Sequence, residues 1–152
     1  MSRTEKLIAA FEHLAQTIST LPDDRSEQIR RLCLGVREFV SEARTRTPRP
    51  TPSQVASGLE QAWREMPEMF EGAKGEWQLT VNRAWHEATM ANYPEFLAAE
   101  KLRLVKVLER GRIKTEAEFY RVRHEVDLLE GRPELHEELH KLYNLIDAYE
   151  AR

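Results

Sequence analysis

Two histidines four residues apart carry the sharpest chemical signal in this sequence. Residues 136–140 read His-Glu-Glu-Leu-His, which is the H-E-x-x-H pattern of a catalytic zinc site. On a helix these side chains share a face, so His136 and His140 could bind one zinc ion while Glu137 acts as general base on its water. One hypothesis for the chain is therefore a small zinc-dependent hydrolase.

Three features of the same segment favour a structural role. The third zinc ligand usually lies downstream, but the sequence ends at Arg152, and an upstream ligand such as His124 or His86 would be unusual. The segment is also rich in glutamate, so the pattern can arise by chance. Amphipathic side chains normally border a core, and four of them border the apolar row here: His136, His140, Tyr143 and Asp147. We therefore expect no catalytic residue, no metal and no cofactor. In the alternative hypothesis of a zinc-dependent hydrolase, His136 and His140 would be the zinc ligands.

Charge is unevenly divided in the C-terminal third of the sequence. Residues 101–123 are rich in lysine and arginine, whereas residues 125–150 are mainly acidic. Two interpretations stay open, namely pairing between helices of the chain itself and a surface for a partner of opposite charge. The partner contacts expected in the second case are Arg103, Lys106, Arg110 and Arg112. The net charge of -3 argues against a general affinity for nucleic acid, and a nucleic-acid accessory protein is a further alternative.

A helical hairpin is predicted to position these residues, over residues 112–152. Its two apolar rows recur at steps of three and four: Phe119, Val122, Val126 and Leu129, then Leu135, Leu139, Leu142, Ile146 and Tyr149. Thr115 and Glu118 predict a capping box, in which the hydroxyl accepts from the Glu118 amide and the carboxylate accepts from the Thr115 amide. Gly131 suits the end of one helix and Pro133 the first turn of the next. Because the loop is short, the two helices should pack antiparallel.

A second hairpin is predicted over residues 1–44. Ser2 and Glu5 open its first helix with a capping box, and this helix should end before Pro22. Asp23 supplies an oxygen and a negative charge for the start of the next helix. The buried row of that helix is expected to contain Ile29, Leu32, Cys33, Val36, Phe39 and Val40. Residues 45–52 then form a proline-rich linker, because alternate prolines favour extended backbone.

Central helices are predicted over residues 53–111. Thr51 caps the first of them, with Pro52 at its first position and Gln54 completing the box. Pro67 should break this helix, and Gly72 with Gly75 should mark a bend. The apolar rows in chain order are Val55, Leu59, Ala62, Trp63 and Met66; Trp77, Val81, Ala84, Trp85 and Ala88; and Leu97, Leu104, Val105 and Leu108. Residues 77–81 alone would also fit a short strand, but the length of the row favours helix. The three tryptophans are expected in the core.

The length and composition of the chain set the fold class. A chain of 152 residues is the size of one domain, and 41% hydrophobic with 32% charged residues is typical of soluble globular proteins. We expect an all-α fold, a single-domain bundle of five to seven helices built from helical hairpins. The one cysteine, Cys33, lies in an apolar row and is expected to be a core residue. Charges interrupt the apolar positions at the start of the sequence, so we expect neither a signal peptide nor a membrane span, and a cytoplasmic setting.

The ends of the C-terminal hairpin resemble a known family. Residues 113–119 read Ile-Lys-Thr-Glu-Ala-Glu-Phe, and residues 145–150 read Leu-Ile-Asp-Ala-Tyr-Glu. This order resembles the helical hairpin at the front of HigA-type antitoxins, over about a quarter of the chain. In that family a helix-turn-helix domain follows, whereas this sequence ends at Arg152, so DNA binding is not expected. The resemblance implies a small, helical, bacterial protein that holds another protein. We therefore expect a non-enzymatic protein-binding module, such as an immunity or antitoxin-like inhibitor.

Overall fold

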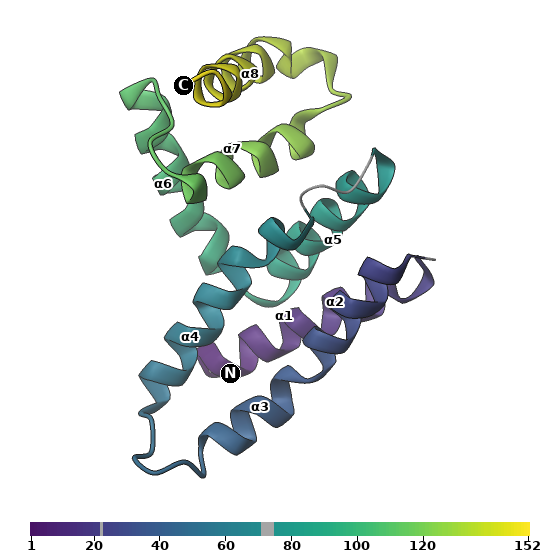
Figure 1. Ribbon diagram of the computed structural model, residues 1–152, viewed down its shortest axis with the longest axis vertical. Coiled ribbons are helices and arrows are strands. Elements are labelled where there is room, and N and C mark those ends of the chain that lie inside the picture. Colours follow the sequence, from purple (N-terminus) through teal and green to yellow (C-terminus); the bar gives the residue numbers. More distant parts are fainter. Residues whose placement is uncertain (22, 71–74) are drawn as a thin grey trace. The chain divides into compact units, whose positions relative to one another are not determined.

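Helices make up all the regular secondary structure of the residues that the computed structural model describes, which are 1–21, 23–70 and 75–152 (Figure 1). The α-helices are α1 (Arg3–Thr17), α2 (Asp24–Leu34), α3 (Val36–Ala43), α4 (Pro52–Glu65), α5 (Glu76–Asn92), α6 (Pro94–Arg110), α7 (Glu116–Leu129) and α8 (His136–Glu150). Short 3-10 helices are η1 (Ile18–Thr20), η2 (Met66–Phe70) and η3 (Pro133–Leu135). Only Gly35 separates α2 from α3. When α2 and α3 are counted as one helix, the described ranges contain seven α-helices. The all-α fold class and the predicted range of helix number are thus confirmed.

The described residues divide into two compact units. The N-terminal unit comprises Met1–Met66 with Ala84–Pro94, and the C-terminal unit comprises Pro67–Arg83 with Glu95–Arg152. Helix α5 therefore contributes residues to both units. The single-domain organisation stays a prediction. In the part of the chain that the structure describes, no helix combines the length and the apolar composition needed to cross a membrane.

Four of the α-helices in the described ranges begin at side chains that the sequence marks as caps, namely α1, α2, α4 and α7. The Ser2 hydroxyl accepts from the Glu5 amide at 3.1 Å, and the Asp23 carboxylate accepts from the Arg25 amide at 2.7 Å. The capping box of α4 is complete, because the Gln54 side chain also accepts from the amide of the capping threonine at 2.8 Å. These contacts satisfy amides that lack a partner within the helix, and they confirm three predicted helix starts.

The capping box predicted for α7 is only half right. The Thr115 hydroxyl accepts from the Glu118 amide at 3.2 Å, as expected. The Glu118 carboxylate, however, accepts from the Lys114 amide at 2.7 Å in place of the Thr115 amide, and it also pairs with Arg110. The Arg110 guanidinium lowers the pKa of the Glu118 carboxyl below its ordinary value. This carboxylate therefore joins the end of α6 to the start of α7.

Helix α1 is the centre of the N-terminal unit, where it packs against α2, α3 and α4. Trp63 of α4 is fully buried, and its ring centroid lies 4.8 Å from that of Phe11 and 5.6 Å from that of Trp85. The Trp63 indole donates to the Thr89 hydroxyl at 3.0 Å, and the Trp85 indole donates to the Trp63 carbonyl at 3.2 Å. Both indole N–H groups are thus satisfied in the core. The core role predicted for these two tryptophans is confirmed, whereas Trp77 is half-buried in the C-terminal unit.

The C-terminal hairpin forms as predicted, with α7 packed against α8. Its buried side chains form one cluster with residues of α6 and of the following turn: Leu104, Val107, Ile113, Val122, Val126, Leu142 and Ile146. Phe119, Leu129 and Leu139 are partly buried against this cluster. Gly131 has a φ of +83° at the end of α7, a conformation that favours glycine. The predicted joint is therefore confirmed at Gly131, whereas Pro133 begins the 3-10 helix η3 in place of the first turn of α8.

Three predicted apolar rows are wrong at particular positions, and in α4 the position is Ala62, which is exposed. Leu32 and Phe39, which we expected in the core, are 44% and 50% exposed. Val105 and Leu108 of α6 are 39% and 41% exposed, and the buried face of that helix is instead Phe96, Leu104 and Val107. Apolar residues occur on more than one face of each helix, and only the face that meets a neighbouring helix becomes buried. The 3-10 helix at Pro67 agrees with the predicted break, while Gly72 of the predicted bend lies outside the described residues.

Candidate functional site: an apolar groove

An apolar groove of about 590 Å³ lies within the N-terminal unit. Its walls are α2 with α3 on one side and α4 on the other, and Phe11 of α1 contributes to its floor. The side chains and glycines that line it are Phe11, Arg31, Leu32, Gly35, Val36, Phe39, Ala43, Arg46, Pro50, Gln54, Val55, Gly58, Leu59 and Ala62. The volume is within the range of about 300–1,000 Å³ that is usual for ligand pockets. The exposed Leu32 and Phe39, misassigned to the core, thus belong to this groove.

The groove forms because α3 and α4 both pack on α1 and are joined by the proline-rich connection (Figure 1). The wall formed by α4 is low, since Gly58 and Ala62 carry little or no side chain and lie one turn apart. A Cβ built on Gly58 would meet no atom within 4 Å. Open space therefore extends over α4 from this position.

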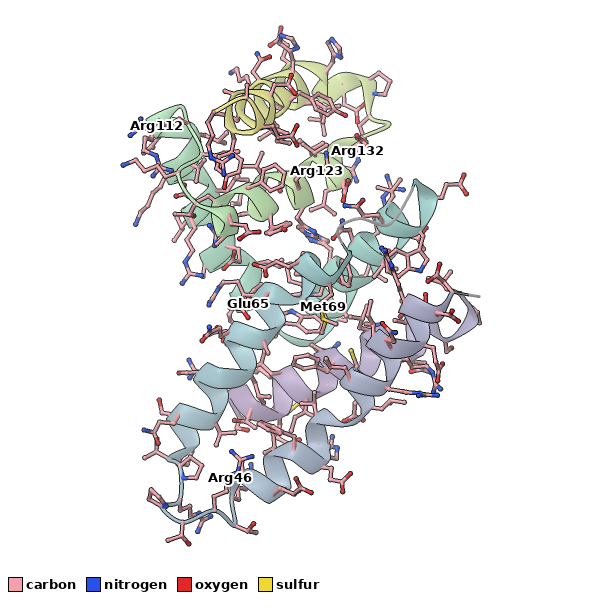
Figure 2. The ribbon with its side chains drawn as sticks, in the orientation of Figure 1. Arg46, Glu65, Met69, Arg112, Arg123 and Arg132 are labelled. Atoms are coloured by element: carbon pink, nitrogen blue, oxygen red, sulfur yellow. The ribbon has the colours of Figure 1, made fainter. Side chains whose placement is uncertain are left out.

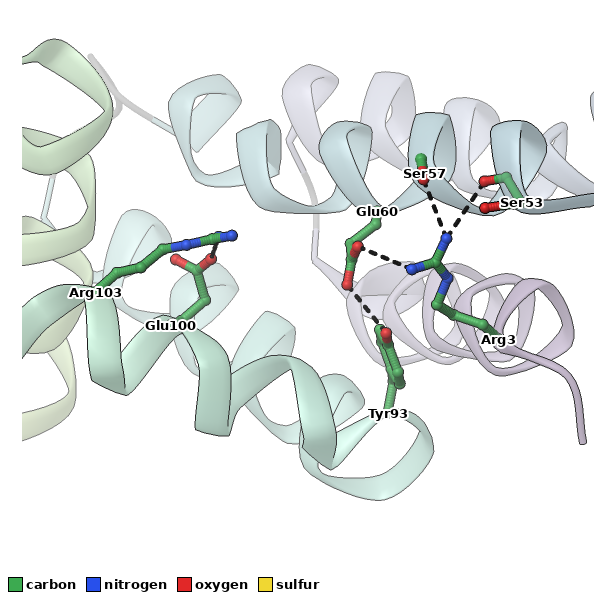
Figure 3. Close-up of polar contacts among 7 residues, drawn as sticks. All are labelled: Arg3, Ser53, Ser57, Glu60, Tyr93, Glu100 and Arg103. Carbon is green, nitrogen blue, oxygen red and sulfur yellow. Dashed lines mark hydrogen bonds and ion pairs between the residues drawn. The ribbon is translucent and has the colours of Figure 1, made fainter.

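Polar contacts hold α4 on α1. The Arg3 guanidinium donates to the Ser53 carbonyl at 3.3 Å and to the Ser57 hydroxyl at 3.1 Å, and it lies 3.7 Å from the Glu60 carboxylate (Figure 3). The Tyr93 hydroxyl donates to the same carboxylate at 3.0 Å. These contacts fix the position of one wall of the groove.

The opposite wall is tied to α1 by Arg37 of α3. Its guanidinium lies 2.7 Å from the Glu12 carboxylate and 3.6 Å from the Glu5 carboxylate. Because these groups are partly exposed, each pair adds little to stability, but together they restrict the orientation of α3. Both walls are therefore anchored to the same central helix.

Arginines are the charged residues of the groove. Arg31 lies on α2, and Arg46 lies in the connection after α3 (Figure 2), with its guanidinium 5.3 Å from the centroid of the Phe39 ring. Arg31 pairs with Glu27 at 3.1 Å, but Arg30 pairs with the same carboxylate at 2.8 Å, so this trio keeps one positive charge. The described residues that line the groove include no acidic side chain. The groove therefore combines an apolar lining with two positively charged side chains.

The four predicted partner contacts lie in the C-terminal unit, and two of them pair within it. Arg103 pairs with Glu100 at 2.6 Å (Figure 3), and Arg110 pairs with Glu118. Lys106 and Arg112 (Figure 2) are exposed, and neither has an ion pair among the residues that the structure describes. Internal pairing thus accounts for two of the four charges. A role of all four in partner binding stays a prediction.

The H-E-x-x-H pattern lies at the start of α8. His136 and His140 are both exposed, as expected for a stripe beside the apolar row. Across 1–21, 23–70 and 75–152, the structure contains no group of three or more histidine, cysteine, aspartate or glutamate side chains that could hold a metal ion. The zinc hydrolase stays an alternative prediction.

A polar cluster, buried at Asn82 and Asp127 and partly exposed elsewhere, joins α5 to α7 in the C-terminal unit and was not predicted. The Asn82 amide donates to the buried Asp127 carboxylate, and the Arg83 guanidinium donates to the Glu130 carbonyl at 3.4 Å. The Tyr143 hydroxyl of α8 donates to the Glu130 carboxylate, a hydrogen bond that raises the pKa of Tyr143 to about 12. Polar groups at apolar spacing carry no separate sequence signal, so this cluster appears only in the folded chain.

The groove itself left one signal in the sequence. Leu32 and Phe39 are two turns apart, at one flank of a row whose centre is already filled by Ile29, Val36 and Val40. A row this wide cannot meet a single neighbouring helix with all its members.

Comparison of the chain with protein-family models, with curated proteins and with solved structures found no match.

Proposed function

We propose that this protein is a non-enzymatic helical protein-binding module and that the groove of the N-terminal unit is its docking surface. One observation carries the proposal: Leu32 and Phe39 stay 44% and 50% exposed beside an apolar groove of about 590 Å³. Contiguous exposed apolar surface of this kind marks interaction sites, because water contact there is unfavourable until a partner covers it.

The narrower form of the proposal is an immunity or antitoxin-like inhibitor that acts in the bacterial cytoplasm. The resemblance of the C-terminal hairpin to HigA-type antitoxins supports this form. In such a protein, Arg103, Lys106, Arg110 and Arg112 would steer an acidic partner, since charges at the rim of an interface act mainly on the association rate. Lys106 and Arg112 suit this role best, because they are exposed and unpaired within the described ranges.

Site-specific photo-crosslinking in the native host tests the proposal. A benzophenone amino acid replaces Phe39, which lines the groove, or Met90, which is 57% exposed on α5 of the same unit and does not line it. The expected result is one protein adduct from position 39 and none from position 90. Equal adducts from both positions, or none from position 39, would contradict the groove as a docking surface.

A further inference from the structure

We infer that the groove takes an amphipathic helix of the partner, with the apolar face of that helix against α3 and α4 and its acidic side chains near Arg31 and Arg46. The inference rests on the proposed function. It adds the secondary structure and the charge of the segment that binds.

The shape of the groove favours a helix. Its walls are themselves helices, α3 of 8 residues and α4 of 14 residues, which span about 12 Å and 21 Å at 1.5 Å per residue. At Gly58 and Ala62 the backbone of α4 is open to close approach, as the packing of two helices at about 8–10 Å requires. A helix of about three turns fits this length. Its apolar residues would recur at i, i+3 or i+4, and i+7.

The charges of the groove favour an acidic occupant with more than one negative group. The Arg46 guanidinium lies beside the Phe39 ring, and Phe39 follows Arg31 by two helical turns, a rise of about 12 Å at 1.5 Å per residue. A fatty acid or similar amphiphile has one anionic head and can meet only one of these cations. Acidic residues on successive turns of a bound helix can meet both. Arg46 has no ion pair among the described residues, so its charge is available to an occupant.

Peptide display tests the inference while the partner is still unidentified. A library of random 16-residue peptides is selected on the wild-type protein and counter-selected on Gly58→Leu, which fills the groove from its open wall. Gly58→Leu should fold, because leucine favours helix more than glycine does and its Cβ meets no atom within 4 Å. The selected peptides should carry apolar residues at helical spacing with aspartate or glutamate beside them, and they should become helical on binding.

The affinity of one selected peptide for variants of the protein then tests the apolar contact and the charge contact separately. Gly58→Leu should weaken binding by about tenfold or more, whereas Ala91→Leu, which adds the same side chain at an exposed site of α5, should not. Arg46→Glu should weaken binding by about twofold to fivefold and reduce its salt dependence. Arg25→Glu, a matched reversal on α2 outside the groove, is the control.

Several results would overturn the inference. Selected peptides that are basic, or that bind as extended chains, would contradict the proposed occupant. Binding of dodecanoate that Gly58→Leu abolishes, with no peptide selected, would identify an amphiphile site instead. The photo-crosslinking result distinguishes the failure of this inference from the failure of the proposed function. An adduct at position 39 together with selected peptides that are not helical would support the groove as a docking surface and contradict the helical occupant.

Discussion

At the scale of single residues, burial decides the effect of a substitution more than residue type does. Leu142 of α8 is 2% exposed in the core of the C-terminal unit, whereas Leu102 of α6 is 67% exposed. Leu142→Ala removes buried methyl groups and leaves a cavity, so the free energy of unfolding should fall by about 2–5 kcal/mol. Leu102→Ala should change it by less than about 0.5 kcal/mol. Denaturant midpoints give both values; equal midpoints for the two variants would show that this cluster is not the core.

Cys33 gives a pH dependence whose sign follows from burial. Burial raises the pKa of its thiol from the ordinary value of 9.0 to about 12, because the thiolate is disfavoured in the core. The unfolded chain therefore loses this proton first as pH rises. The stability that the neutral thiol contributes is fully present below pH 9.0 and is lost as pH rises toward about 12. We expect the wild type to lose stability relative to Cys33→Ala above pH 9.0, measured as the difference between denaturant midpoints. A difference independent of pH would contradict a buried thiol.

At the scale of helices, one substitution should have opposite signs at two glycines. Gly58 lies inside α4 with open space around it, so Gly58→Ala should raise the free energy of unfolding by about 0.5–1 kcal/mol. Gly131 has a φ of +83°, where a Cβ is strained, so Gly131→Ala should lower it by about 1–2 kcal/mol. Thermal or denaturant unfolding of the two variants measures both effects. A loss of stability in Gly58→Ala would mean that the wall of the groove is not an ordinary helix surface.

Helix boundaries were predictable from the sequence because their causes are local. Ser2, Asp23 and Thr51 accept hydrogen bonds from amides two or three residues away, so their effect does not depend on the rest of the fold. The buried face of α6 was not predictable to the same degree. Its leucines and valines occur on several faces, and Val107 is buried in place of Leu108 only because the C-terminal hairpin covers that side.

At the scale of the whole molecule, the all-α class follows from helical periodicity along nearly the entire sequence. The width of the apolar row over α2 and α3 was the one sign of the groove in the sequence. It does not give the position of the groove, because this depends on where α3 and α4 pack on α1, and Leu32 and Phe39 have the residue types of a core. The charged residues show the same limit. Arg103 and Arg110 look available in the sequence, but the fold places Glu100 and Glu118 beside them. Charge reversal at these two arginines would therefore also disturb contacts within the C-terminal unit.

The affinity of the crosslinked partner for the wild type and for three variants tests the central claim most directly. Isothermal titration calorimetry with Gly58→Ala, Gly58→Leu and Ala91→Leu compares a small addition to the groove, a filled groove and a matched addition elsewhere. If the groove is the docking surface, Gly58→Leu should raise the dissociation constant by about tenfold or more, while Ala91→Leu leaves it unchanged. An equal dissociation constant for the wild type and a stably folded Gly58→Leu would show that the partner binds elsewhere.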